Sequence, residues 1–484
     1  MGCGSSKGPS SGKSSVTRAS RIPGPLSRED LEKRSVAVED KLTTPDLDVD
    51  WAAVSQRGFY PREASKPNQD GYIAQPCFNG KTNMSLFAVL DGHGATGHKC
   101  ARYCAKVLPT NIAEAIDQQG SSVDYPAALT TAFEKTNTDL RGNLEINDLH
   151  SGTTCCAILI VGSTYYVANV GDSRAIVART RRPGTGEGPG ETPPGTNSGH
   201  FRTVNLSRGS IDESGRLIAK PLSYDQTPFR KDERDRCKAA GARVLTANML
   251  SGSKRQSEDF NEPGENEFDK EGDPPRIWLK SRASPGTAFS RSFGDGEAES
   301  VGVCATPEIE QREVRKEDVF IMIASDGVFE FLTNQNVSDV VVRSMQENNS
   351  HLEACRTVVT EAYAQWMTWD VRSDDITMII LNVGGSGVEE ESEAARGRGG
   401  SVDMSRFEGV KSPNTAAMAE ALGANEGEGN PSPSQNGGFF GLFSGPPSPP
   451  SAEEESEQAS PTGRVRAGSL APGTTLDTTG VNQV

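Results

Sequence analysis

The stretch SLFAVLDGHGATGHKCA occupies residues 85–101 and decides how the fold is interpreted. Residues 85–90 are almost entirely apolar, which predicts a buried strand, and residues 97–117 carry apolar side chains at helical spacing. An Asp-Gly-His tripeptide, residues 91–93, stands between the two elements. The sequence therefore predicts an aspartate and a histidine at the edge of a sheet.

The same order of strand and aspartate recurs in VFIMIASDGVFEFL, residues 319–332, where Asp326 follows an apolar run. Two more aspartates adjoin apolar runs, Asp70 in KPNQDGYIA and Asp375 in RSDDITMIILNV. A further one, Asp172, lies in a Gly-Asp-Ser sequence that predicts a hairpin turn. Because Asp-Gly and Gly-Asp are common in turns, each aspartate taken singly is more simply explained as a turn residue. Only their joint occurrence indicates a function.

Carboxylates at the ends of buried strands would converge at one edge of the sheets, where uncompensated charges are costly. Oxygen ligands suit hard cations, so we expect Mg²⁺ or Mn²⁺ rather than Zn²⁺, with the carbonyl of Gly92 as a further ligand. Two such ions about 3.5–4 Å apart can activate a water for attack on phosphorus, as in a phosphomonoesterase. His93 could then protonate the departing alkoxide, although a histidine in a turn is, on its own, more simply a solvent-exposed or capping residue.

The composition limits the class of protein. Of the 484 residues only 34% are hydrophobic, whereas glycine and proline number 51 and 29, so a sizeable part of the chain is not packed core. The formal charge of −16 argues against nucleic acid as the main partner. The nine cysteines lack C-x-x-C spacing, which favours a reducing, cytosolic setting. No apolar run approaches the roughly 18 residues that a membrane span requires.

Shifts in composition divide the chain into three parts. The N-terminal part begins Ser/Gly-rich and basic without acids, the central part alternates strand and helix periods, and the C-terminal part is acidic and rich in glycine, serine and proline. We expect both ends to be disordered. The predicted parts are a basic arm at 1–48, a domain at 49–384 with low-complexity insertions at 180–200 and 246–275, and a tail at 385–484.

Within the central domain the apolar periodicity predicts six strands and five helices. The predicted strands are 85–90, 153–161, 164–170, 174–178, 319–324 and 376–383. The predicted helices are 97–117, 124–141, 231–241, 334–346 and 351–368.

Eight segments, in order along residues 52–384, together resemble the PPM-type (type 2C) metal-dependent serine/threonine protein phosphatases. They are NQDGY (68–72), FAVLDGHGATGH (87–98), SGTTCCAILI (151–160), VANVGDSRAIV (167–177), AFSRSFGD (288–295), ATPEI (305–309), FIMIASDGVFEFL (320–332) and SDDITMII (373–380). One such motif is weak evidence, whereas the ordered set is highly specific. The resemblance implies an α+β fold, a β-sandwich of two mainly antiparallel sheets flanked by helices in α-β-β-α layers, with a binuclear Mn²⁺ or Mg²⁺ centre at one end.

The resemblance also implies roles for individual residues. The expected metal ligands are Asp70, Asp91, Gly92, Asp326 and Asp375. His93 is the expected general acid, Asp172 the expected contributor to a weaker third metal site, and Arg174 and Asp295 correspond to structural partners. Residues 225–280 correspond to a flap beside the catalytic cleft. The substrates would be phosphoserine and phosphothreonine in proteins, hydrolysed by a water that the two metal ions activate.

Three positions depart from the family's pattern. Gln69 stands where many members have glutamate, and Glu330 stands where aspartate is frequent. Ser65 occupies the place of an arginine that often holds the substrate phosphate. Lys66 is then the nearest cation and Arg62 the next, so the phosphate-binding residue is one of these two.

The N-terminus MGCGSSK fits the M-G-x-x-x-[ST] pattern of myristoylation, with Gly2 as the acceptor and Cys3 available for palmitate. One acyl chain binds membranes only marginally, so Cys3 or the basic arm would supply the second signal. An unmodified N-terminus is the alternative. We expect a monomeric enzyme that is lipid-anchored at the cytosolic face of a membrane.

Two other classes of function are alternatives to an active phosphatase. A pseudophosphatase that acts as a membrane scaffold is suggested by Gln69, Ser65 and the long tail, but the expected core aspartates are all present. A calcium-binding module is the weaker alternative, because its ligands would cluster within about a dozen residues.

Overall fold

The computed structural model describes residues 26–43, 48–180, 217–252, 260 and 273–383. All of them belong to the first of two compact units, Met1–Gly441, and the second, Leu442–Val484, lies outside the described residues. The predicted tail, nearly all of the first insertion and the acylation signal also lie outside them.

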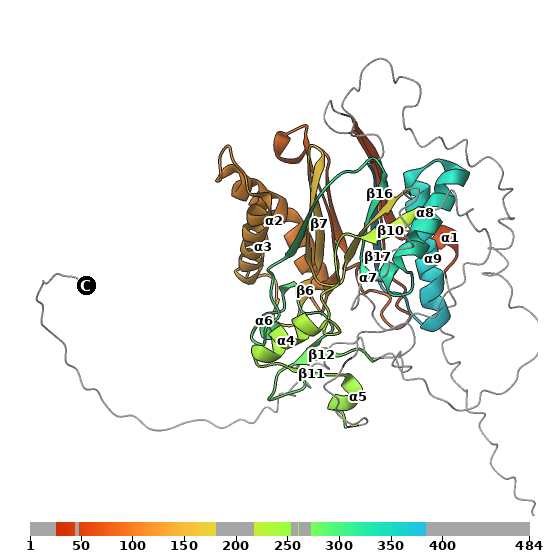
Figure 1. Cartoon of the computed structure of the whole chain (residues 1–484). Helices are drawn as coiled ribbons and strands as arrows, with labels where there is room; N and C mark the ends of the chain where they lie inside the picture. The colour runs from red at the N-terminus through yellow and green to blue at the C-terminus, as the bar shows by residue number, and fades with distance from the viewer. Residues whose placement is uncertain (1–25, 44–47, 181–216, 253–259, 261–272, 384–484) are drawn as a thin grey trace, which may run out of the picture. The chain divides into compact units, whose positions relative to one another are not determined.

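Two antiparallel sheets face each other at the centre of the domain (Figure 1). The six-stranded sheet has the order β1 (Ser35–Thr43), β2 (Asp48–Gln56), β17 (Ile376–Asn382), β16 (Asp318–Ala324), β9 (Arg174–Arg179) and β10 (Ile218–Pro221). The five-stranded sheet has the order β15 (Glu308–Glu313), β8 (Thr164–Val170), β7 (Cys155–Val161), β4 (Met84–Leu90) and β3 (Gly71–Gln75). The predicted sandwich of mainly antiparallel sheets is confirmed.

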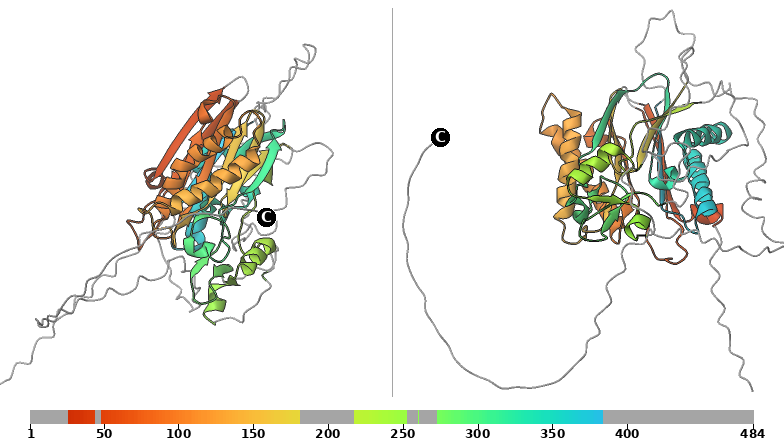
Figure 2. Two further views of the ribbon diagram at one scale, coloured as in Figure 1. Left: turned by 90° about the vertical axis from the view of Figure 1, so that its left-hand side faces the viewer. Right: turned by 60° about the horizontal axis from the view of Figure 1, so that its bottom comes forward.

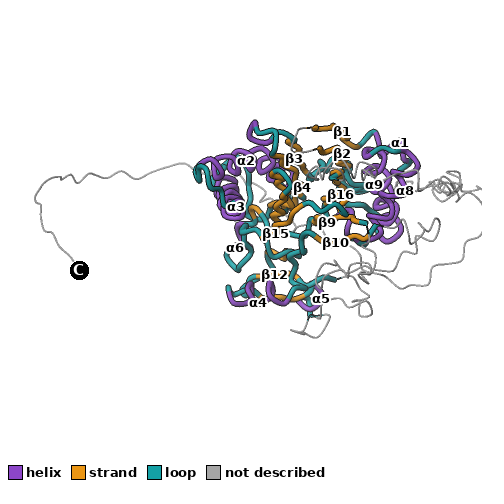
Figure 3. Tube along the Cα trace, turned by 45° about the horizontal axis from the view of Figure 1, so that its top comes forward, coloured by secondary structure: helices purple, strands orange, loops and turns teal. Residues whose placement is uncertain are grey.

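Helices cover the outer face of each sheet, which gives four layers (Figures 1 and 3). Two long helices, α2 (Gly97–Asp117) and α3 (Tyr125–Arg141), lie side by side over the five-stranded sheet (Figure 2, left). On the other side, α8 (Asn334–Asn348) and α9 (His351–Trp369) cover the six-stranded sheet, with α9 packing against β2 and β17. Within the described residues, no helix is long and apolar enough to cross a membrane.

Helix ends coincide with capping residues in the sequence. Thr333 and Asn336 form a reciprocal capping box at the start of α8, and the Ser350 side chain accepts a hydrogen bond from Glu353 N at the start of α9. These caps explain why the two adjacent helices begin where they do.

The central strands are buried on both faces, because one face meets the other sheet and the opposite face meets helices. All seven residues of β4 and all seven of β16 are buried. Apart from Ser85 and Asp318, their sequences are therefore continuous apolar runs rather than alternating ones. Between the sheets the core contains Trp51, Phe87, Tyr165, Ile323 and Leu381.

A smaller region joins the end of the sandwich where the loops gather, drawn at the bottom of Figure 1. It has its own apolar cluster around Cys237 and Ile277. Its helices are α4 (Lys231–Ala239), α5 (Ala247–Leu250) and α6 (Gly296–Glu299), and its sheet is β11 (Arg243–Leu245), β12 (Arg276–Trp278) and β13 (Pro285–Thr287). A fourth, small sheet is formed by β14 (Phe293–Gly294), β6 (Gly152–Thr153) and β5 (Gly92–His93).

The predicted boundary of the N-terminal arm is wrong. Residues 28–43 form α1 (Arg28–Glu32) and β1, and β1 pairs with β2 along its full length. Leu31 is buried in the core beneath α9, and the Leu26 amide donates a hydrogen bond to Tyr363 Oη at 2.9 Å. As an edge strand, β1 tolerates polar and charged residues, so its sequence lacks the apolar pattern by which strands were predicted.

The second insertion also begins later than predicted. The carboxylate of Asp273 accepts the backbone amides of Ala247 and Asn248, at 3.0 and 2.7 Å, so α5 is held against the residues that follow the insertion. Residues 246–252 are therefore an ordered part of the smaller region.

Candidate metal centre

The topology brings the predicted aspartates to one end of the sandwich. Asp91 directly follows β4, and Asp70 directly precedes β3, whose first residue pairs with the last residue of β4. Asp326 follows β16 and opens the short helix α7 (Asp326–Phe329). Asp375 precedes β17, which runs antiparallel to β16. The strand ends of both sheets therefore meet at this point.

Their charges act on one another. Burial, followed by the charge of Asp375, raises the pKa of Asp70 to about 8. Burial, followed by Asp326 and then Asp70, raises the pKa of Asp91 well above its ordinary value. The pKa of Asp326 is raised in the same way, first by burial and then by Asp172. Several buried carboxyls without a neutralising side chain require either protons or cations.

Two carboxylate oxygens at this end are buried and have no hydrogen-bond partner among the described residues. They are Oδ1 of Asp70 and Oδ1 of Asp326. The other oxygen of Asp70 accepts a hydrogen bond from Ser325 Oγ at 3.0 Å, which fixes the orientation of the carboxylate. Buried, unpartnered carboxylate oxygens fit a hard divalent cation.

Gly92 allows three backbone segments to approach closely. A Cβ at this position would lie 2.4 Å from the carbonyl oxygen of Gly97 and 2.5 Å from that of Gln69. The preceding residue is fixed as well, because Asp91 N donates to Thr154 Oγ1 and its carbonyl accepts from Thr154 N. This packing explains the glycine and fits the predicted use of its carbonyl as a ligand.

The structure favours Asp374 over Asp375 as a ligand. Both oxygens of Asp375 accept backbone amides, from Gly58 at 2.6 Å and from Gln69 at 2.8 Å, so this side chain fastens two loops. The charge of Asp374 contributes to the raised pKa values of Asp91 and Asp326, after burial and closer carboxylates. The charge of Asp375 acts on Asp70 more than that of Asp374 does, so the preference for Asp374 rests on the two occupied oxygens of Asp375.

His93 lies on β5 beside the aspartates and is held by Asp295. Its Nε2 is 2.6 Å from Asp295 Oδ2, and its ring centroid is 4.4 Å from that of Phe289. Burial alone would lower the pKa of His93, but Asp295 and then Asp172 raise it, and the net shift is upward. The arrangement therefore favours an imidazolium beside the carboxylate cluster.

The turn between β8 and β9 contributes Asp172 and Arg174. Burial, followed by Asp225, raises the pKa of Asp172 to about 7, and Glu330 contributes further. Arg174 is buried and donates from Nε and Nη2 to the two oxygens of Asp225, at 2.9 and 2.5 Å. Sequence analysis did not identify Asp225, because 51 residues separate it from its partner.

The two candidate phosphate-binding cations differ in their surroundings. Lys66 is half-buried, and its Nζ lies 3.9 Å from the ring centroid of Tyr60. Arg62 is exposed.

A second acidic group lies between the smaller region and β15, and arginines already neutralise it. Oxygens of Asp232, Glu233 and Glu308 lie within 4.8 Å of one another. Arg230 bridges Asp232 and Glu308, and Arg291 bridges Glu233 and Glu308. Arginine pairing explains this cluster as a structural network.

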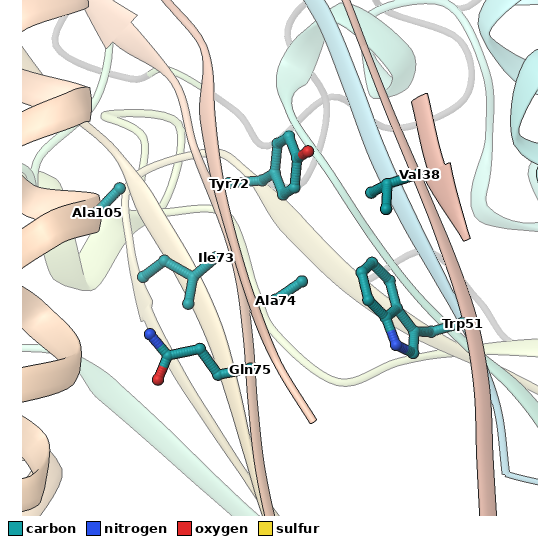
Figure 4. Close-up of a pocket in the computed structure, with 7 residues that line it drawn as sticks. All are labelled: Val38, Trp51, Tyr72, Ile73, Ala74, Gln75 and Ala105. Atoms are coloured by element: carbon teal, nitrogen blue, oxygen red, sulfur yellow. The ribbon is translucent and has the colours of Figure 1, made fainter. Parts of the chain in front are cut away.

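A crevice lies where the edges of the two sheets open, between β1 and β2 on one side and β3 on the other (Figure 4). Its volume is about 430 Å³, and it is lined by Val38, Trp51, Tyr72, Ile73, Ala74, Gln75 and Ala105. None of these residues belongs to the aspartate cluster.

Comparison with known proteins identifies the family. The family model described as "Protein phosphatase 2C" matches residues 61–369. The chain is 37% identical over 344 residues to "Probable protein phosphatase 2C 35" of Arabidopsis thaliana, covering 71% of this chain and 86% of that protein. It is 29% identical to "Probable protein phosphatase 2C 64" of Oryza sativa subsp. japonica, covering 68% of this chain and 65% of that protein.

The fold has a solved counterpart. The structure titled "Crystal structure of serine-threonine phosphatase 2C from Toxoplasma gondii" has a TM-score of 0.52 and 15% identity, and the match covers 72% of this chain and 98% of that one. The chain belongs to the protein phosphatase 2C family. It is a metal-dependent protein serine/threonine phosphatase.

Proposed function

We propose that this phosphatase uses two Mg²⁺ or Mn²⁺ ions, held by the aspartates at the end of the sandwich. The proposed ligands are Asp70, Asp91, the carbonyl of Gly92, Asp326 and, in place of Asp375, Asp374. When bound, such a pair of ions would neutralise the phosphoryl group and supply an activated water. The observation that carries the proposal is the pair of buried, unpartnered oxygens on Asp70 and Asp326.

His93 is proposed to hold the proton that the departing serine or threonine oxygen requires. Asp295 supports this role, because its carboxylate orients the ring and favours the protonated form. Asp172, whose charge acts on Asp326, is proposed to contribute to a weaker third cation site.

The deciding experiment measures phosphate release from a phosphothreonine peptide by the purified chain, first in EDTA and then in Mn²⁺. We expect release only with Mn²⁺ and its loss in Asp326→Asn. A folded protein that binds Mn²⁺ but releases no phosphate would overturn the proposal in favour of a scaffold.

We also propose that the chain is anchored to the cytosolic face of a membrane by acylation of Gly2 and Cys3, which lie outside the described residues. The support is the sequence pattern together with residues 1–27, which are basic and contain no acid. In cells, Gly2→Ala should move the protein from the membrane to the soluble fraction, and Cys3→Ser should do so in part. A membrane fraction unchanged by Gly2→Ala would contradict the anchor.

The remaining expectations concern partners. We propose that the chain is a monomer. We also propose that it does not bind nucleic acid, because the net charge is −16. Light scattering of the purified protein measures its mass in solution, and a mass twice that of one chain would refute the monomer.

A further inference from the structure

The loop at residues 57–66 is fastened to the segment that carries the proposed ligand Asp374. Gly58 N donates to Asp375 Oδ1 at 2.6 Å. Phe59 and Ser373 exchange two hydrogen bonds, from Phe59 N to Ser373 Oγ at 2.9 Å and from Ser373 N to the Phe59 carbonyl at 3.0 Å. A Cβ on Gly58 would lie 2.6 Å from the carbonyl carbon of Asp374, so only glycine permits this approach.

Tyr60 reaches from this loop to Asp374 itself. Its hydroxyl donates to Asp374 Oδ1 at 2.6 Å, and only 7% of the residue is exposed. The backbone amide of Asp375 donates to the same oxygen at 2.9 Å. Because both hydrogen bonds end on Oδ1, Oδ2 is the oxygen that they leave for a cation.

The aromatic ring of Tyr60 makes a second contact, with the ammonium group of Lys66. The ammonium lies 3.9 Å from the ring centroid, which is within the range of a cation–π interaction. The backbone around Lys66 is braced, because the Arg57 guanidinium donates to the carbonyls of Ala64 and Lys66 at 2.6 and 2.5 Å. Arg62, on the same loop, is exposed.

We propose that Tyr60 is a positioning residue that joins the two halves of the phosphatase site. Its hydroxyl orients Asp374 toward a metal ion, and its ring seats Lys66, rather than Arg62, against the phosphate of the substrate. The inference rests on the proposed function, since it assumes a cation at Asp374 and a phosphate beside it. One side chain then sets the distance between metal and phosphate-binding cation.

Two substitutions separate the two roles. Tyr60→Phe removes the hydroxyl but keeps an aromatic face, so we expect the Kd for Mn²⁺ to rise about tenfold while phosphate affinity changes less than about twofold. Lys66→Met removes the charge and keeps the length of the side chain, so we expect phosphate affinity to fall about tenfold with Mn²⁺ affinity unchanged. Tyr60→Leu should weaken both.

Two control variants match these changes. Tyr165→Phe deletes another buried phenol hydroxyl, one that has no hydrogen-bond partner among the described residues, and should alter neither affinity. Arg62→Met deletes the neighbouring cation and should leave phosphate affinity within about twofold of wild type, because an exposed charge is well screened.

The measurement is calorimetry on the full chain, with Mn²⁺ titrated into metal-free protein and inorganic phosphate titrated into Mn²⁺-loaded protein. Neither titration needs turnover, so a wild type that binds both but releases no phosphate from the peptide refutes the proposed function alone. The inference would be overturned if Tyr60→Phe bound Mn²⁺ as tightly as wild type. It would also be overturned if Arg62→Met lost phosphate binding while Lys66→Met kept it.

Discussion

His93 Nε2 lies 2.6 Å from Asp295 Oδ2, and the same carboxylate oxygen accepts the hydroxyl of Ser292 at 2.6 Å. Asp295 itself is held in a left-handed backbone conformation, with φ 53°, and its side chain packs against Gly152, where a Cβ would lie 2.3 Å from Oδ2. An asparagine has the same shape and fits the site, where it removes the charge and keeps one acceptor oxygen.

Asp295→Asn should lower the pKa of His93, because Asp295 is the main group that raises it against the effect of burial. If the imidazolium donates the proton, the alkaline limb of the kcat profile should move to lower pH, and kcat at pH 8 should fall about tenfold for a shift of one unit. The profile with a phosphothreonine peptide between pH 6 and 9 measures this.

Ser292→Ala is the matched control, because it removes the other donor to Asp295 and keeps the charge. Its alkaline limb should stay in place or move to higher pH. A uniform loss of kcat in Asp295→Asn, with no displacement of the limb, would restrict Asp295 to a structural role.

Asp374→Asn and Asp375→Asn should have different effects although the residues are adjacent. Residues that hydrogen-bond to metal ligands typically contribute about 10–100-fold to metal affinity. We therefore expect Asp374→Asn, which changes a proposed ligand, to lower Mn²⁺ affinity by more than about 100-fold. Asp375→Asn should lower Mn²⁺ affinity by only about tenfold. Asp375→Asn should instead destabilise the fold by about 1–3 kcal/mol, because one of the amides of Gly58 and Gln69 loses its acceptor. Mn²⁺ calorimetry and urea unfolding separate these outcomes. Equal losses of Mn²⁺ affinity in both variants would contradict the assignment of Asp374.

The apolar runs of the sequence predicted most of the strands and helices that are buried on both faces. The helix at 97–117 and the strand at 164–170 match the structure to the residue. The strand β1 was missed because an edge strand buries little and carries Glu39, Asp40 and Lys41. The strand β2 was missed as well, although it lies between β1 and β17 and its residues 51–56 are buried. Periodicity therefore finds most of the central strands and loses the edge strands.

The aspartate cluster was predictable in outline, because carboxylates at the ends of buried strands converge at one edge of the sheets. The choice between Asp374 and Asp375 was not, since it depends on which of the two adjacent side chains meets the amides of Gly58 and Gln69, more than 300 residues away in the sequence. The role of Tyr60 could not be predicted from the sequence, because its contact with Asp374 joins loops that are far apart in the chain.

The metal-free protein should become less stable as the pH rises from 6 to 8. The folded-state pKa is raised to about 8 for Asp70 and to about 7 for Asp172. A carboxyl with a raised folded pKa stabilises the fold while protonated, and this contribution is lost as the pH rises toward that pKa, by up to about 1.4 kcal/mol per pH unit for one group.

Saturating Mn²⁺ should reverse this trend, because the cation binds the deprotonated carboxylates. Thermal unfolding in EDTA and in Mn²⁺, across the same pH range, tests the reversal. Parallel pH dependences under the two conditions would show that the carboxyl cluster does not bind the ion.

Arg174 and Asp225 form a buried ion pair whose side chains are 1% and 5% exposed. Arg174 Nη1 also donates to Asn334 Oδ1 at 2.9 Å, so the pair ties the β8–β9 turn to the start of α8. Removing one partner leaves a buried charge uncompensated, and Arg174→Met should therefore lower the free energy of unfolding by about 3–5 kcal/mol. Adding Asp225→Asn should recover much of this loss, because the orphaned charge is gone.

Lys231→Met, in the exposed pair with Asp235, is the control and should leave the urea midpoint unchanged. A double variant no more stable than Arg174→Met would mean that the arginine acts through its contact with Asn334 and its packing against Phe329 rather than through the ion pair.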